Sequence, residues 1–251
     1  VEINQHLPYE LTTLPEVLKE NGYATAMIGK WHLGDEKASA TLHGFDFQLP
    51  QWNKGWPNTG YHFPYDMEGL EEGKEGEYLT DRLTDEALKF IENNKDNPFF
   101  LYLSHFAVHD PIEGRKDLVE KYAGKLGNMS YPGEPFILEG NPDDEDVPTR
   151  EELNELIQKP DYQGYKIFED GTVKIKQHQD NMAFAAMVES MDESFGRIVG
   201  KLKDLGLDNN TLVVFYSDNG GMSSANFYNP NRRIGAKNLD KAFATSNLPL
   251  R

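Results

Sequence analysis

Two side chains that could take part in chemistry stand at the end of the first apolar run of the sequence. Lys30 and His32, a cation and an imidazole, follow residues 24–28 and are separated by one residue. If the chain stays extended there, alternation turns both side chains to the same side. Open α/β sheets bind ligands at the carboxyl ends of their strands. The pair is therefore a candidate ligand site, and a solvated lysine beside a hydrogen-bonded histidine is the ordinary alternative.

Two further polar loops follow apolar runs of strand length. Residues 99–104 lead into a loop that carries His109, and residues 211–216 lead into Asp218 and Asn219. Continuous apolar runs of this length are typical of strands buried on both faces of a parallel sheet. Each loop also has an ordinary interpretation, because the histidine could cap a turn and Asp-Asn-Gly-Gly is a common turn sequence.

In a parallel sheet these three loops lie at one edge. We therefore expect five side chains to converge there: Lys30, His32, His109, Asp218 and Asn219. His105 precedes the second loop and has aromatic and apolar neighbours, so we predict a structural role for it.

Helical and strand patterns alternate along the chain and must position these loops. Thr13 and Glu16 form a capping box that predicts a helix ending at Asn21, and Thr80 is predicted to cap a second helix. An apolar repeat over residues 180–205 predicts the longest helix, with its apolar stripe in the core. The members of that stripe are Met182, Ala185, Val188, Met191, Phe195, Ile198, Leu202 and Leu205. The alternation predicts a doubly wound, mostly parallel α/β sheet flanked by helices.

Between the second and third loops, residues 112–179 show weaker patterns. Acidic sequence with proline and glycine over residues 139–147 predicts a loop. Residues 165–168 and 172–175 flank Glu-Asp-Gly and predict a short hairpin. We interpret the region as an insertion that could form part of a substrate rim.

Composition narrows the classes of partner. Formal net charge is −17, with 42 acidic and 25 basic residues, which argues against nucleic acid or an anionic membrane as partner. The chain has no cysteine, which excludes disulfides, thiolate metal sites and a cysteine nucleophile within it. No apolar run approaches the roughly 20 residues that cross a bilayer. The chain begins with Val1, so the lack of a visible signal peptide does not bear on its compartment.

Three segments resemble the signatures of the formylglycine-dependent sulfatases, which have an alkaline-phosphatase-like α/β fold. Residues 22–32, Gly-Tyr-Ala-Thr-Ala-Met-Ile-Gly-Lys-Trp-His, resemble the second signature of that family. Residues 107–111, Ala-Val-His-Asp-Pro, resemble its loop after a central strand, with Val108 in place of the commoner proline. Residues 217–220 resemble its Ser-Asp-Asn-Gly segment. The resemblance implies a sulfatase catalytic domain over residues 1–251.

The resemblance also implies a role for each candidate residue. Lys30 would hold the sulfate oxygens, and His32 would hydrogen-bond the formylglycine hydroxyl and act as a base. His109 would contact the ester oxygen and protonate the departing alcohol. Asp218 and Asn219 would be oxygen ligands of Ca2+. The implied substrate is a sulfated small molecule or a sulfated polysaccharide, and the implied compartment is periplasmic or secreted.

The sequence departs from the family pattern in two respects. The Cys/Ser-x-Pro/Ala-Ser/Thr-Arg run that becomes formylglycine is missing, and so are two early aspartate ligands of the metal. We therefore interpret the chain as an internal fragment of a sulfatase, incomplete at both ends and inactive by itself. A phosphoesterase or phosphonate hydrolase of the same superfamily and a non-catalytic homologue are the alternatives.

Overall fold

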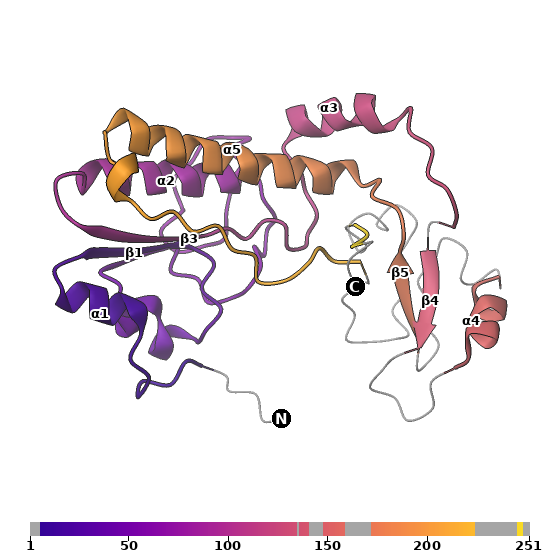
Figure 1. Cartoon of the computed structure of the whole chain (residues 1–251), viewed down its shortest axis with the longest axis horizontal. Helices are drawn as coiled ribbons and strands as arrows, with labels where there is room; N and C mark the ends of the chain where they lie inside the picture. Colours follow the sequence, from indigo (N-terminus) through magenta and orange to yellow (C-terminus); the bar gives the residue numbers. More distant parts are fainter. Residues whose placement is uncertain (1–5, 135, 141–147, 159–171, 224–244, 248–251) are drawn as a thin grey trace. The chain divides into compact units, whose positions relative to one another are not determined.

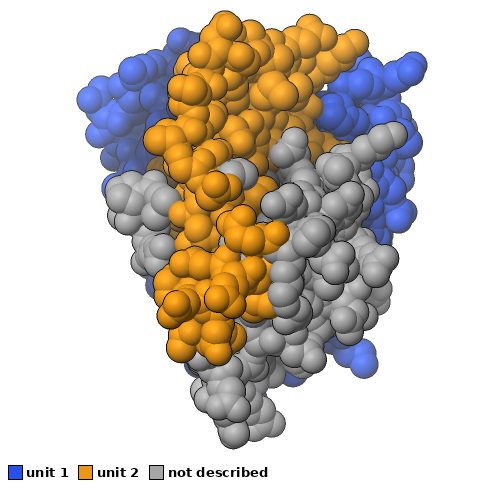
Figure 2. Space-filling view, turned by 90° about the vertical axis from the view of Figure 1, so that its right-hand side faces the viewer, with its two compact units in different colours: residues 1–109, 188–214 blue, residues 110–187, 215–251 orange. Residues whose placement is uncertain are grey.

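The computed structural model describes residues 6–134, 136–140, 148–158, 172–223 and 245–247. The chain divides into two compact units, which Figure 2 colours separately. The first comprises residues 1–109 and 188–214, and the second comprises residues 110–187 and 215–251. Each unit is described by itself below.

The first unit is built on a parallel sheet of three strands in the order β2-β1-β3. The strands are β1 (Ala24–Gly29), β2 (Phe47–Leu49) and β3 (Phe99–Ser104). The central strand pairs with both neighbours, and Ala26 lies opposite Phe47 on one side and Leu101 on the other. Residues 25–29 are buried, because this small apolar strand lies in the middle of the sheet. Two of the three predicted strands are thus confirmed in their residues. The burial on both faces that was predicted for residues 99–104 is wrong, because β3 lies at the edge of this described sheet and Tyr102 is 48% exposed.

Helices cover both faces of this sheet (Figure 1). Helix α1 (Leu14–Glu20) lies on one side, and it begins at the predicted capping box of Thr13 and Glu16. Helix α2 (Leu79–Asn93) lies on the other side and packs against β1 and β3. Its cap is Tyr78 and not the predicted Thr80, which lies one residue inside the helix.

Helix α5 (Met182–Asp204) was correctly predicted as the longest helix, but its buried face was predicted only in part, with Leu202 buried as expected. Ser190 and Ser194 are buried, whereas Val188 and Phe195 of the predicted stripe are each about two-fifths exposed at 43% and 40%. Ser194 contacts α2, where the Thr84 hydroxyl lies 2.6 Å from Ser194 Oγ. A small hydroxyl side chain fits this contact, so hydrophobicity alone did not identify the whole buried face.

The strand predicted at residues 211–216 is wrong for this structure. No described strand includes these residues, and Leu212 and Tyr216 are 89% and 85% exposed. A strand forms only where a neighbour supplies its ladder of hydrogen bonds. None of the described strands pairs with this segment, so its apolar composition was not sufficient.

The second unit contains an antiparallel pair, β4 (Phe136–Gly140) and β5 (Thr172–Lys176). The predicted strand at 172–175 is confirmed, but its partner is β4, and the predicted partner 165–168 lies outside the described residues. The loop predicted from residue 139 is wrong at Glu139 and Gly140, which belong to β4. Two short helices, α3 (Lys116–Leu126) and α4 (Arg150–Ile157), were not predicted.

The remaining elements are short 3-10 turns at Glu36–Ala38, Ala40–His43 and Asp208–Asn210. Among the described residues, none of the helices has the length and apolar character that crossing a membrane requires.

Candidate functional site

The end of β1 places Lys30 beside the end of β3. The Lys30 amide donates a hydrogen bond of 2.7 Å to the carbonyl of Ser104. Gly29 makes this approach possible, because a Cβ on it would lie 1.8 Å from the Ser104 carbonyl oxygen. Its φ of +113° is a further reason for glycine, since other residues rarely adopt that conformation. The two strand ends are therefore fixed against each other.

His109 is held by the loop that follows β3. Its amide donates to the carbonyl of Phe106 at 2.9 Å, and its own carbonyl accepts from the Tyr61 hydroxyl at 2.9 Å. Tyr61 is fully buried and stacks on Tyr78 at the start of α2. The backbone of His109 is thus anchored to the packed interior of the first unit.

The indole of Trp56 contacts the rings of both His32 and His109. The Trp56 ring lies 6.3 Å from the His32 ring in an edge contact and 6.2 Å from the His109 ring in a stacked contact. Gly55 lies directly against His32, because a Cβ on it would be 2.5 Å from the His32 Nδ1 atom. Sequence reasoning missed Trp56 and Gly55, since they lie in an irregular segment without periodicity.

The His32 imidazole lies in a positively charged environment. Desolvation lowers the pKa of the His32 imidazole, and the positive charges of Lys30 and His109 lower it further. The structure thus brings together three of the five predicted residues, all in the first unit. A neutral imidazole is favoured at His32, and it lies beside a cation and a second imidazole.

Asp218 and Asn219 belong to the second unit. Both are exposed, and the Asn219 amide donates to Asp218 Oδ1 at 2.9 Å, as in the turn that their sequence favours. Their meeting with Lys30 and His32 stays a prediction. A carboxylate and an amide oxygen are hard donors that suit Ca2+, which takes six to eight oxygens. Within the described residues, no group of three or more His, Cys, Asp or Glu side chains forms a metal cluster.

His105 has the structural place predicted for it, in a buried polar chain. Its Nε2 lies 2.9 Å from Ser194 Oγ, which lies 2.6 Å from the Thr84 hydroxyl, which lies 2.6 Å from the carbonyl of Thr80. The Thr84 hydroxyl is placed to donate to both the Thr80 carbonyl and Ser194 Oγ, and it has one hydrogen for the two contacts. The His105 ring is held through Nε2 by a serine hydroxyl that can donate or accept. The other ring nitrogen, Nδ1, is buried without a hydrogen-bond partner, and burial lowers the pKa of His105 to about 4.

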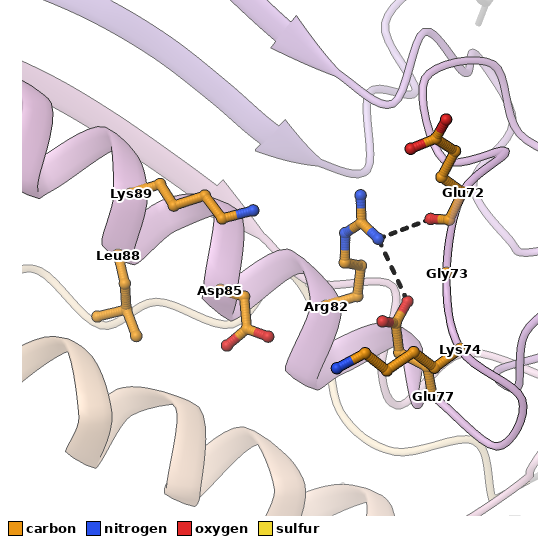
Figure 3. A pocket seen from close by; sticks show the side chains of 8 residues that line it. All are labelled: Glu72, Gly73, Lys74, Glu77, Arg82, Asp85, Leu88 and Lys89. Carbon is orange, nitrogen blue, oxygen red and sulfur yellow. Dashed lines mark hydrogen bonds and ion pairs between the residues drawn. The ribbon is translucent and has the colours of Figure 1, made fainter.

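A separate hollow of about 560 Å³ lies beside α2 in the first unit (Figure 3). Its walls carry both signs of charge, and Arg82 is already bonded to the carbonyl of Glu72 at 2.7 Å and to the Glu77 carboxylate at 3.4 Å. None of the predicted site residues lines it. The hollow is therefore distinct from the cluster around Trp56.

Comparisons with known proteins agree with the family that the three sequence segments resemble. A relative from Schizosaccharomyces pombe, an uncharacterised sulfatase, is 30% identical over 247 residues, which cover 87% of this chain and 42% of the relative. The arylsulfatase of Klebsiella aerogenes is 28% identical over 244 residues, with 87% and 49% covered. The N-acetylgalactosamine-6-sulfatase of Mus musculus is 29% identical over 238 residues, with 87% and 35% covered. The chain thus spans less than half the length of these relatives.

The fold agrees as well. The crystal structure of Ps i-CgsB superposes with a TM-score of 0.50 at 20% identity, over 82% of this chain and 39% of that one. The parallel sheet between helices is that of the alkaline-phosphatase-like fold. The family model described as Sulfatase matches residues 1–243, which include Lys30, His32, His109, Asp218 and Asn219. The chain belongs to the sulfatase family.

Proposed function

We propose that this chain is part of the catalytic domain of an enzyme that hydrolyses sulfate esters, R–O–SO3− + H2O giving R–OH + HSO4−. The observation that carries the proposal is the cluster of Lys30, His32 and His109 at the carboxyl edge of the sheet, within a chain of the sulfatase family. A sulfate ester is an anion whose bridging oxygen gains negative charge as it leaves. A cation and two imidazoles are suited to binding that anion and moving the protons.

Each side chain has a separate task in this proposal. Lys30 pairs with the sulfate oxygens and offsets the charge that develops on the bridging oxygen. His32 accepts a proton, because desolvation and its cationic neighbours favour the neutral imidazole. His109 donates a proton to the ester oxygen as the sulfur–oxygen bond breaks, so that the product leaves as an alcohol.

Two further groups complete the proposal. Ca2+ held by Asp218 and Asn219 would polarise the sulfate, and formylglycine from a segment beyond the printed sequence would supply the nucleophile. The donor types at Asp218 and Asn219 support the metal.

We infer that the substrate is a sulfated sugar and that residues 112–179 form part of its rim. One supporting relative is named N-acetylgalactosamine-6-sulfatase, and it covers 87% of this chain. A sulfated saccharide outside the cytoplasm fits the expected periplasmic or secreted compartment.

Hydrolysis of 4-nitrophenyl sulfate by the full-length protein that contains this chain tests the proposal. Lys30→Ala should lower kcat/KM by about 100-fold or more, because it removes charge stabilisation at the leaving oxygen. Lys89→Ala is the matched control, since Lys89 is an exposed lysine of the same unit that pairs with Glu86 at 2.8 Å. Preference for 4-nitrophenyl phosphate would favour a phosphoesterase instead. Turnover of neither ester would favour a non-catalytic homologue.

A further inference from the structure

Trp56 is a fixed indole that remains partly open to solvent. Its flanking residues Gly55 and Pro57 are buried, and its carbonyl accepts a hydrogen bond of 3.0 Å from the Trp52 indole. The Trp56 side chain is nevertheless 40% exposed. Covering a large aromatic ring that is already held in place at the surface is favourable, because a ligand then removes apolar area from water.

The neighbours of this ring define what could cover it. The His109 ring stacks on Trp56, the His32 ring meets it in an edge contact, and the charge of Lys30 acts on His32. These polar groups are proposed above to hold the sulfate and the bridging oxygen, so the exposed indole lies next to the position of the alcohol half. Apolar surface beside a few convergent polar groups is typical of small-ligand sites.

A ring fits this surface better than an open chain. A pyranose presents a face of C–H groups with its hydroxyls at the rim, and an aryl ring presents a flat apolar face. Either ring can lie flat on the indole and cover its exposed face. A flexible alkyl chain covers less area, and it loses conformational entropy when it is ordered. The proximity of Trp56 to His109 would then hold the ester oxygen of that ring near its proton donor.

We propose that Trp56 forms a subsite for the ring of the substrate alcohol, a pyranose or an aryl ring, next to the sulfate position. This inference rests on the proposed function and goes beyond it, because it assigns a specificity-determining residue. It predicts that the ring, and not the sulfate alone, is recognised by this chain.

Kinetics on the full-length protein tests the subsite. Trp56→Ala should raise KM and lower kcat/KM by roughly tenfold for 4-nitrophenyl sulfate or a galactose sulfate, whereas ethyl sulfate, which has no ring, should change by less than about threefold. Trp56→Phe should restore most of the loss. Tyr23→Ala is the matched control, because it removes an exposed aromatic side chain that precedes the opposite end of β1.

Equal losses on cyclic and open-chain esters, or no loss on cyclic esters, would overturn the subsite while the enzyme remains a sulfatase. Calorimetric titration with the unsulfated alcohols measures binding at the subsite without requiring hydrolysis. Binding of methyl galactoside or 4-nitrophenol that is lost in Trp56→Ala supports the subsite even if no ester is hydrolysed, and the tighter of the two identifies the ring class. Binding unchanged in Trp56→Ala overturns it.

Discussion

At the scale of single residues, the two histidines around Trp56 have different surroundings and should differ in role. Desolvation and two cationic neighbours favour a neutral His32, whereas His109 is held through its backbone by Phe106 and Tyr61. One imidazole is thus suited to accept a proton, and the other is anchored where a leaving oxygen is expected. The proposed roles of base for His32 and acid for His109 therefore follow from their different contacts.

His109→Ala should therefore affect poor leaving groups most. General-acid help is worth roughly 10²- to 10⁴-fold, and an alkoxide needs it more than an activated phenolate does. We expect the full-length variant to lose more activity on a galactose sulfate than on 4-nitrophenyl sulfate, with kcat as the measurement. Equal losses on both esters would rule out the acid role and leave a binding role.

Gly55→Ala should disturb the same cluster without removing any of its functional groups. The added Cβ would lie 2.5 Å from the His32 Nδ1 atom, so the imidazole must rotate away. Misplacing a catalytic group by about 1 Å can cost roughly 100-fold in rate, so we expect kcat to fall by about 10- to 100-fold.

The urea midpoint of Gly55→Ala should change little, because the added Cβ meets the His32 side chain, which can rotate away. Gly196→Ala is the matched control, because nothing lies within 4 Å of its added Cβ. That control should keep full activity and gain about 1 kcal/mol from helix propensity. Unchanged kcat in Gly55→Ala would contradict the placement of His32.

The sequence was sufficient to predict that Lys30, His32 and His109 lie near one another, because each follows an apolar strand whose carboxyl end could be located. Trp56 and Gly55 could not be found in this way. They belong to a long irregular segment, where the position of a side chain depends on contacts between distant residues and not on periodicity. Asp218 and Asn219 follow a predicted strand that the structure does not contain, so their place in the site remains a prediction.

At the scale of elements, His105 ties the end of β3 to α5 and α2 through Ser194 and Thr84. Its neutral ring should make stability depend on pH. Because the folded-state pKa is lowered to about 4, the unfolded chain binds a proton that the native state lacks as the pH falls from about 6.5 to about 4. Stability should therefore decrease through that window, by on the order of 3 kcal/mol.

Urea unfolding between pH 7 and pH 4 measures this dependence. His105→Gln keeps a donor for Ser194 and does not titrate, so its free energy of unfolding should fall less steeply over the same window. His6→Gln is the control at an exposed histidine and should follow the parent curve. A parent-like slope in His105→Gln would show that His105 is not the cause of this loss of stability.

Element prediction succeeded where local signals and packing agree. The capping box of α1 and the apolar runs of β1 and β3 identified these elements, because capping and strand propensity are local signals. Burial was predicted correctly for β1 and not for the edge strand β3. The buried face of α5 was predicted only in part, because Ser190 and Ser194 are buried although they are polar, and Ser194 contacts Thr84 of α2 through its hydroxyl. The strand predicted at 211–216 is wrong, because a strand needs a hydrogen-bonded neighbour and the sequence of one segment does not show whether that neighbour is present.

At the scale of the whole molecule, the exposed apolar surface is consistent with further packing in a longer protein. Val214 and Phe215 are 73% and 72% exposed, and Val188 on α5 is 43% exposed. Exposed apolar side chains such as these are suited to packing against another segment. The chain covers 42% of its S. pombe relative, so the proposed longer protein has segments that could pair with residues 211–216.

The same proposal predicts that residues 1–251 alone hydrolyse no sulfate ester. The printed sequence has no cysteine and no serine in the Ser-x-Pro/Ala-Ser/Thr-Arg pattern, so it lacks the family's nucleophile. Covalent catalysis divides a difficult displacement into two easier steps, so without the attacking group that route is lost and not merely slowed. Lys30, His32 and His109 would still bind and orient the ester.

Release of 4-nitrophenol from 4-nitrophenyl sulfate by purified residues 1–251 measures this. We expect no rate above that of the His109→Ala variant of the same chain, and activity only after the coding sequence is extended upstream to include the nucleophile pattern. Turnover by residues 1–251 unaided would show that another group attacks the sulfate. The absence of that pattern from the upstream sequence would show that the longer protein is not a formylglycine enzyme.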